Sequence, residues 1–428
     1  MPTSTAPDLP DTVAYTPPAA SHPRASTTPT DRLHALDALR AMAMFLGVVL
    51  HAALCFMTFD IPFTPRMDSS RSGIFNIVVF TIHAFRMQAF FLVAGYFAAL
   101  LLSKRTPGTF LRNRALRIGL PLVVGAFTIV PLTILPFLLA HDVPITPATL
   151  PALVRAPAHL WFLIYLSVFC LAAAVYAAVL ERAPRGPGNG GLLARVAASA
   201  WAVPLMILPT VLLNLTMPSW SIDTPWGWLP RPTSLAYYGL FFATGYALHR
   251  AGSVGRVGRA WRWMLPLTLL VLVPAFLFFA GAAPVAFEYG GWSNFLGTRL
   301  AVLPAVIAQA AVTWGMVCSL IGLLMHCCTN PRPWVRWCAD SSYWVYLLHL
   351  PIVYFLNLYL ASWTIPGIPA GGLTAIIKFT IFLTTTVTLC LITYALLVRP
   401  TPLERIIGGS GKKPRSLNDI PATPAARA

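Results

Sequence analysis

Two titratable side chains share one face of the first apolar segment. Arg40 and His51 are eleven residues apart in 36-LDALRAMAMFLGVVLH-51. In an α-helix this spacing is three turns plus about 20°, so both side chains point the same way, ~16 Å apart along the axis. An imidazole titrates near neutral pH and can take a proton from a hydroxyl. His51 is therefore a candidate catalytic base.

Other basic side chains lie at matching depths in separate apolar segments. His83 and Arg86 are one helical turn apart, and His349 lies within 341-SSYWVYLLHLPIVYF-355. Charged and titratable groups are costly inside a bilayer and usually face a cavity or a functional pathway. The sequence therefore predicts a polar cavity reached from both sides. Lys378, near the end of its segment, is interpreted as a surface anchor.

The composition is that of a membrane protein. Of the 428 residues, 57% are hydrophobic and 10% are charged, and the mean hydropathy is +0.70, whereas a soluble domain has about 25% charged residues. We expect an all-α, polytopic membrane helix bundle of about ten transmembrane helices. The predicted spans are 36–58, 74–102, 118–140, 160–180, 197–217, 233–249, 263–282, 300–325, 341–360 and 372–398.

Basic residues alternate from loop to loop, which predicts an orientation. With the N-terminus in the cytoplasm, most of the 30 Lys and Arg residues fall on the cytoplasmic side, as the positive-inside rule requires. Both termini are then cytoplasmic. The net charge of +17 is explained by this topology and by contact with anionic lipid, so we expect no nucleic-acid partner.

Three regions are expected along the chain. Residues 1–31 read as a disordered cytoplasmic tail without signal-peptide features, residues 32–400 as the ten-span membrane domain, and residues 401–428 as a basic, disordered tail. The seven cysteines show neither a disulfide pattern nor zinc-ligand spacing, so no metal site is predicted.

The basic loop 103-SKRTPGTFLRNRALRIGLP-121 has two interpretations. It is an ordinary cytoplasmic loop rich in positive charge, or Arg112, Arg114 and Arg117 form a clamp for phosphates.

The buried His and Arg residues are also open to two interpretations. A proton-coupled secondary transporter would use them as an ion path, but no internal repeat supports this. A serine-hydrolase triad has no motif here, and no carboxylate lies at membrane depth to orient His51.

Four stretches together resemble the acyltransferase-3 superfamily of integral membrane acyltransferases. They are 32-RLHALDALRAMAMFLGVVLH-51 with its Arg-(ten residues)-His pattern, 83-HAFRMQAFFLVAGYF-97, Arg114-Ala-Leu-Arg117, and Tyr343 to Pro351. One departure is Ala94, where the family usually has Ser before Gly95. Within the superfamily, 83-HAFRMQAFF-91 and 159-HLWFLIYL-166 look most like the glucans biosynthesis protein C branch of periplasmic glucan succinyltransferases.

The resemblance implies an enzyme of the bacterial inner membrane with acyl-CoA as co-substrate and no resident cofactor. CoA phosphates would lie on Arg112, Arg114 and Arg117, with Arg40 as a further candidate. His51 would take the proton of an attacking sugar hydroxyl. Arg86 or His83 would stabilise the oxyanion, and Arg86 is also a candidate for the free carboxylate of a succinyl group.

The acceptor would be a glucan or another glycan on the outer side. Its candidate contacts are His349, His159, Glu288 and Trp226. Tryptophan is also common at any membrane interface, so the interpretation of Trp226 as part of an aromatic belt is favoured over sugar binding. The sequence does not define the acyl group, the acceptor or the oligomeric state.

Overall fold

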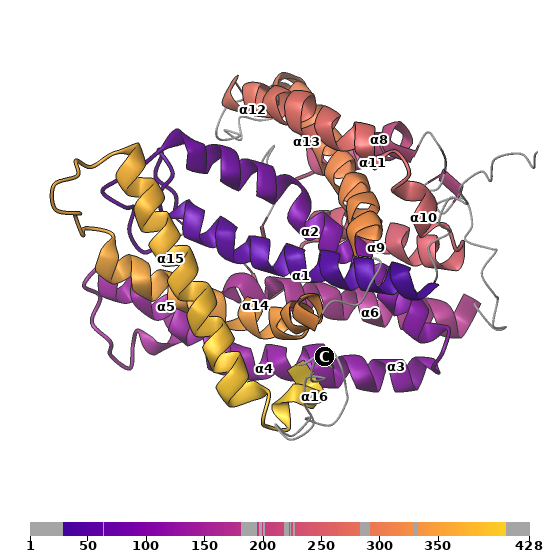
Figure 1. Cartoon of the computed structure of the whole chain (residues 1–428), viewed down its shortest axis with the longest axis horizontal. Coiled ribbons are helices and arrows are strands. Elements are labelled where there is room, and N and C mark those ends of the chain that lie inside the picture. Colours follow the sequence, from indigo (N-terminus) through magenta and orange to yellow (C-terminus); the bar gives the residue numbers. More distant parts are fainter. Residues whose placement is uncertain are drawn as a thin grey trace, which may run out of the picture.

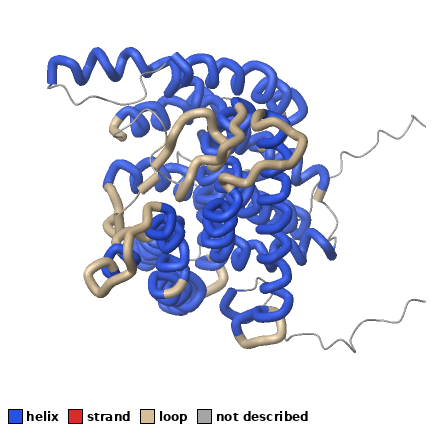
Figure 2. The backbone as a smooth tube through the Cα atoms, turned by 90° about the vertical axis from the view of Figure 1, so that its left-hand side faces the viewer, coloured by secondary structure: helices blue, strands red, loops and turns tan. Residues whose placement is uncertain are grey.

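In the computed structural model, the described part of the chain forms helices joined by loops and turns (Figure 2). The described residues are 29–62, 64–180, 195–196, 199, 202–217, 222, 224–225, 227–282, 292–328 and 333–407. No strand occurs among them. The predicted all-α polytopic bundle is confirmed.

The described residues form α-helices and short 3₁₀- and π-helical segments, the latter two labelled η. In chain order they are α1 (Pro29–Leu54), α2 (Gly73–Leu102), α3 (Pro107–Arg114), η1 (Ala115–Gly119), α4 (Leu120–Phe127), α5 (Ile129–Ala140), η2 (Leu150–Val154), η3 (Ala158–Leu160), α6 (Trp161–Leu180), α8 (Ala202–Leu215), α9 (Pro232–Arg250), α10 (Val254–Val257), α11 (Trp261–Leu267), η4 (Thr268–Leu272), α12 (Val273–Ala282), α13 (Trp292–Cys327), α14 (Pro333–Leu360), α15 (Gly372–Thr393), η5 (Tyr394–Val398) and α16 (Leu403–Ile407).

Eight helical segments within the described residues are long and apolar enough to cross a bilayer. They correspond to eight of the ten predicted spans. The other two are α8, which has 14 residues, and α9, whose 19 residues include Thr, Ser, Gly and Tyr side chains. Much of α9 is buried against other helices, and a helix shielded from lipid by protein tolerates more polar side chains.

Helices α1 and α2 lie at the centre of the bundle (Figure 1). Helix α1 packs against α2, α13, α14 and α15, and α2 packs most extensively against α9. Gly95 and Gly245 lie at the α2–α9 contact, where an added Cβ would collide with Phe242 O and Leu92 O respectively. Small residues allow such close backbone approach, which drives helix association in membranes. Gly95 is therefore explained by packing.

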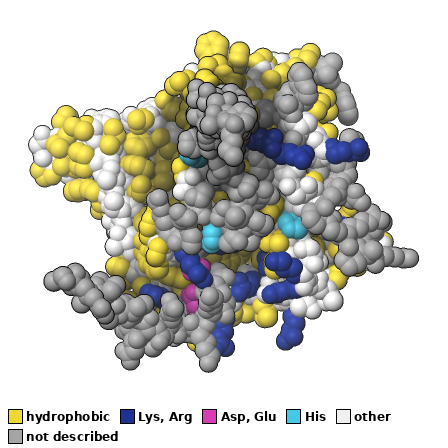
Figure 3. All heavy atoms as spheres, turned by 45° about the vertical axis from the view of Figure 1, so that its right-hand side comes forward, with side chains coloured by type: hydrophobic (Ala, Val, Ile, Leu, Met, Phe, Trp, Pro, Cys, Tyr) yellow, Lys and Arg dark blue, Asp and Glu magenta, His cyan; other side chains and the backbone are white. Residues whose placement is uncertain are grey.

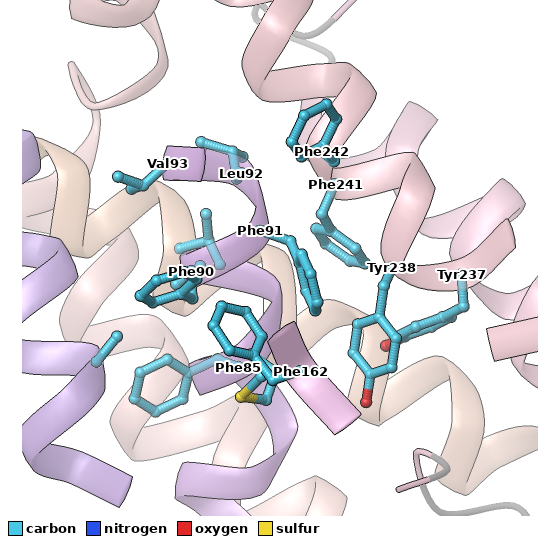
Figure 4. Close-up of a cluster of buried hydrophobic side chains, with 14 of the residues drawn as sticks. Phe85, Phe90, Phe91, Leu92, Val93, Phe162, Tyr237, Tyr238, Phe241 and Phe242 are labelled. Carbon is cyan, nitrogen blue, oxygen red and sulfur yellow. The ribbon is translucent and has the colours of Figure 1, made fainter. Parts of the chain in front are cut away.

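A buried aromatic cluster holds α2, α6 and α9 together (Figure 4). The Phe91 ring lies 5.0 Å from Tyr238 and 5.1 Å from Phe162, measured between ring centroids. Phe90 meets Phe162 edge-on at 4.5 Å. These tilted and edge-to-face contacts are favourable for aromatic rings. Because the cluster lies about one turn beyond Arg86 on α2, it fixes how that part of α2 is rotated.

Lys378 is not the surface anchor that its position near a helix end suggested. Its side chain is fully buried and donates hydrogen bonds to Asp68 at 2.7 Å, to Ala361 O at 3.2 Å and to Trp363 O at 2.9 Å. The loop between α1 and α2 turns inward and brings the Asp68 carboxylate to the ammonium, so snorkelling is unnecessary. Backbone hydrogen bonds from Asp68 N–H to Cys55 O and from Ser69 N–H to Ala361 O hold this loop in place.

Ordered structure continues past the predicted boundary at residue 401. Helix α16 (Leu403–Ile407) packs against α14, η1 and η5. Its Glu404 is buried and accepts a hydrogen bond from the Tyr394 hydroxyl at 3.1 Å. Burial raises the pKa of the Glu404 carboxyl. Residues 1–28 and 408–428, which hold most of the two predicted tails, lie outside the described residues.

Candidate active site

Three histidines from separate elements meet in the middle of the bundle. The His51 ring of α1 lies 5.3 Å from the His349 ring of α14, and the His349 ring lies 5.3 Å from the His159 ring of η3, between centroids. His159 and His349 are buried, whereas His51 keeps a partly exposed surface. The sequence predicted that His51 and His349 lie together, and it placed His159 only as an acceptor-side candidate.

Arg86 of α2 joins this cluster through a gap left by a glycine. A Cβ added to Gly47 would collide with Arg86 Nη1, and it would lie 3.5 Å from Arg86 Cζ and 4.0 Å from His349 Nε2. Gly47 precedes His51 by four residues and so lies on the same face of α1. Sequence reasoning missed Gly47, although its spacing from His51 was a signal that could have found it.

The guanidinium of Arg86 has no ion pair with any carboxylate in the described part of the chain. Its Nε is buried without a hydrogen-bond partner among those residues, while Tyr238 and Tyr346 lie within electrostatic range. A cation inside a protein normally has a compensating partner. Arg86 can therefore bind an anion or a developing negative charge supplied by a ligand.

Backbone carbonyls determine the tautomers of two of the rings. His349 Nδ1 lies 2.8 Å from Tyr346 O and 3.1 Å from Val345 O, and His159 Nε2 lies 3.2 Å from Leu347 O. A carbonyl only accepts, so the proton of neutral His349 is on Nδ1 and that of His159 is on Nε2. The opposite nitrogens, His349 Nε2 and His159 Nδ1, are buried without a partner within the described region. They are free to accept a proton.

Tyr346 connects the histidines to one another. Its hydroxyl donates to His159 O at 2.7 Å, and its ring lies 5.2 Å from the His159 ring and 6.3 Å from the His349 ring. The sequence stretch 341–355 contained Tyr346, but no role was assigned to it. Its position three residues before His349, on the same helix face, is the signal that marks it.

His83 is held differently from the other histidines. Its Nε2 lies 3.0 Å from Ile222 O, in the segment that precedes α9. It remains within electrostatic range of His51. His83 therefore connects α2 to this segment, and Arg86, one turn further along α2, is the group that reaches His349.

The predicted phosphate-binding arginines differ in their surroundings. Arg112 is exposed, whereas Arg114 and Arg117 are partly buried. Arg114 donates to Asn113 Oδ1 at 2.8 Å, and Arg117 donates to Arg405 O of α16 at 3.2 Å. Arg117 belongs to η1, a π-helical turn, a feature often found at functional sites. Arg40 pairs with Asp37 at 3.3 Å and is within electrostatic range of both partly buried arginines.

Figure 3 shows the side of the bundle that contains α3 and α10, and Lys and Arg side chains gather on this face. We call Arg40, Arg114 and Arg117 the basic cluster. Helix α14 joins this cluster to the histidines: the Tyr343 hydroxyl donates to Arg117 O at 3.0 Å, and the Tyr343 ring stacks on Tyr346 with a centroid distance of 6.2 Å. One helix face therefore connects the basic cluster to the three histidines.

Two further acceptor-side candidates, Glu288 and Trp226, lie outside the described residues. A neighbouring tryptophan, Trp228, donates from Nε1 to Val154 O at 2.9 Å and so connects the segment before α9 to η2. Within the described part of the chain, no group of three or more His, Cys, Asp or Glu side chains is arranged to hold a metal ion.

The chain matches the Acyl_transf_3 acyltransferase domain family over residues 33–395. Because the match covers most of the 428 residues, the protein belongs to this family, and the predicted resemblance is confirmed. The family and the eight apolar helices together identify a multi-pass membrane acyltransferase.

Curated relatives share a smaller part of the chain. Over 154 residues it is 32% identical to the glucans biosynthesis protein C of Salmonella paratyphi B and to that of Salmonella heidelberg. The aligned part is 33% of this chain and 38% of each relative, so the chain matches well under half of their length. No solved structure matches the chain.

Proposed function

We propose that the protein is a membrane O-acyltransferase that moves an acyl group from cytoplasmic acyl-CoA to a hydroxyl of an extracytoplasmic glycan. One observation carries the proposal: His51, His349 and Arg86 lie together in the bundle with polar atoms that have no partner among the described residues. Buried polar atoms normally have hydrogen-bond partners, and those that lack one need an explanation. A reacting substrate would supply the missing partners.

The chemistry assigned to His51 is general-base catalysis. As the sugar oxygen attacks the thioester carbonyl carbon, the ring takes the hydroxyl proton. The tetrahedral intermediate then collapses, the C–S bond breaks, and the proton held by His51 neutralises the departing thiolate. An ester and free CoA are formed, and the ring returns to its neutral state. General-base catalysis contributes about 10²–10⁴-fold to the rate.

Arg86 has two possible partners in this scheme. It would stabilise the oxyanion that forms on the thioester carbonyl, or it would bind the free carboxylate of a succinyl group. The name of the relatives, glucans biosynthesis protein C, favours a glucan as the acceptor. The inner membrane is the proposed location, because there an enzyme meets acyl-CoA on one side and a periplasmic glycan on the other.

The basic cluster is the proposed docking site of the donor. Arginine forks bind phosphate groups with two hydrogen bonds, and Arg114 Nε has no partner within the described structure. His51 lies eleven residues beyond Arg40 on α1, ~16 Å along the axis. The flexible pantetheine arm of CoA would cross this distance alongside Tyr343 and Tyr346 of α14.

The test is release of free CoA thiol by purified protein, supplied with acyl-CoA in the presence or absence of a glucan. We expect acceptor-dependent release, with acyl ester on the glucan detected by mass spectrometry. His51→Ala should lower the rate about 10²–10⁴-fold, while His249→Ala should not. His249 is a suitable control because it also has a buried, unpartnered Nδ1 among the described residues but packs on Tyr96.

Two results would contradict the proposal. Normal turnover by the His51→Ala protein would remove the assigned base. Proton-coupled uptake of a solute into vesicles, without CoA release from any donor, would favour the secondary transporter. Succinyl-CoA and acetyl-CoA compared side by side would show whether Arg86 has a carboxylate to bind.

A further inference from the structure

A general base is more effective when a second group holds its ring in the correct orientation. In hydrolase triads that group is a buried carboxylate hydrogen-bonded to the imidazole Nδ1–H. The charged and titratable groups within electrostatic range of His51 are His349 from α14, Arg86 and His83 from α2, and His159 from η3, and the His349 ring is in direct contact. None of these is a carboxylate. A different group must orient His51.

Two unpartnered nitrogens lie on adjacent rings. His51 Nδ1 and His349 Nε2 are both buried without a hydrogen-bond partner among the described residues, and the two ring centroids are 5.3 Å apart. A donor and an acceptor left over on neighbouring rings can satisfy each other when the rings reorient. Hydrogen bonds between catalytic groups are often long or misaligned before substrate binds and shorten in the complex.

The tautomer of His349 suits it to accept. Its Nδ1–H is occupied by Tyr346 O and Val345 O, which leaves a lone pair on Nε2. The neighbouring guanidinium of Arg86 opposes a second positive charge on the ring, because like charges at this range repel. His349 therefore stays neutral and keeps Nε2 as an acceptor. Tyr346, whose hydroxyl is fixed by His159 O, holds this part of α14 in place.

We propose that His349 is a positioning residue for the catalytic base: it accepts a hydrogen bond from His51 Nδ1–H and thereby directs His51 Nε2 to the acceptor hydroxyl. The inference rests on the proposed function and assigns His349 a task other than acceptor binding. When His51 takes up the hydroxyl proton on Nε2, His349 Nε2 accepts from the cationic ring and stabilises it without itself being protonated.

The experiment compares five variants in the CoA-release assay with the full-length protein. His349→Ala should lower kcat about 10²–10³-fold with little change in KM for acyl-CoA or glycan, since orientation affects the transition state and not substrate binding. His349→Gln should recover at least tenfold of this loss, because its amide oxygen can accept the same hydrogen bond. His249→Gln, the matched control, should behave like the unmodified protein.

The decisive comparison is the double variant. If His349 acts through His51, then His51→Ala combined with His349→Ala should be no slower than His51→Ala alone, because groups that work as a unit are not additive. Losses that multiply in the double variant would overturn the positioning role, as would a rise in glycan KM without a fall in kcat. If the His349 variants release CoA at the unmodified rate while His51→Ala is inactive, this inference alone is overturned. An active His51→Ala protein would overturn the proposed function as well.

Discussion

Two cations inside the bundle, Lys378 and Arg86, differ in how their charges are compensated. Lys378 donates to the Asp68 carboxylate and to two backbone carbonyls, and its side chain is fully buried. Arg86 remains partly exposed, has no ion pair with a described carboxylate, and its Nε has no partner in the described part of the chain. The contrast separates structure from function: the Lys378 site is complete without a ligand, whereas the Arg86 site needs one.

The largest effect is expected when the Lys378 pair is broken. Lys378→Met leaves a buried carboxylate without its cation, which typically costs about 3–5 kcal/mol of stability. Thermal unfolding of the purified protein in detergent should show a clear drop in the midpoint. Adding Asp68→Asn should recover much of it, because no lone charge then remains. A midpoint equal to that of the unmodified protein in Lys378→Met would show that the pair contributes nothing.

Arg86→Met should have the opposite signature. Loss of a group that stabilises an oxyanion lowers kcat by about 10²–10³-fold. The unfolding midpoint should stay the same or rise, since the cation that is removed has no ion pair with a described carboxylate. The measurement is kcat and the thermal unfolding midpoint of each variant, both determined on the same preparation. If Arg86→Met lost stability as Lys378→Met does, the two cations would have the same role and the contrast would fail.

A smaller effect on kcat is expected at Gly47, whose missing side chain leaves room for the Arg86 guanidinium. Gly47→Ala places a methyl group where Arg86 Nη1 lies, so the guanidinium must move. Displacement of a catalytic group by about 1 Å can cost up to about 10²-fold, and we expect roughly tenfold in kcat. Gly73→Ala is the matched control, because its new methyl group meets nothing within 4 Å. Equal kcat values in Gly47→Ala and Gly73→Ala would show that catalysis does not depend on the position of the Arg86 guanidinium.

The smallest effect is expected in the basic cluster. Arg117→Gln removes one of several positive charges at a partly solvated site, so KM for acyl-CoA should rise only about two- to fivefold. The difference from the unmodified protein should shrink at high salt, because screening weakens the attraction. Arg256→Gln, on an exposed arginine of α10, is the control. A fall in kcat with constant KM would place Arg117 in the chemistry instead of in donor binding.

Much of the site could be predicted from the sequence, because the position of a residue within an apolar segment indicates its depth in the bilayer. Counting residues from the ends of the spans put His51, Arg86 and His349 at similar levels of the bilayer, and the structure brings these three together. The same count put His83 there too. The depth of a residue does not indicate which way its side chain points around the helix axis. The His83 side chain points toward Ile222 O.

The sequence did not indicate that His159 meets His349. His159 lies one residue before its predicted span, and it was predicted only as an acceptor-side candidate. Its backbone forms the short turn η3, which packs against α5 and places the ring 5.3 Å from His349. Lys378 was misjudged for a related reason. The α1–α2 loop has no apolar pattern that reveals its inward path, so nothing in the sequence linked Asp68 to a lysine 310 positions away.

The amino-acid sequence alone determined the helical class, the approximate spans, the family and the identity of the main basic groups. The helical class and the spans follow from hydropathy and helical periodicity, which are local properties of the chain, and the family follows from its resemblance in four short motifs. Only the tertiary structure decided which side chains meet, which imidazole nitrogens remain free and which cation is neutralised. These outcomes depend on helix rotation and close approach, set by contacts such as Gly95 with Phe242 and Gly47 with Arg86, between residues far apart in the chain.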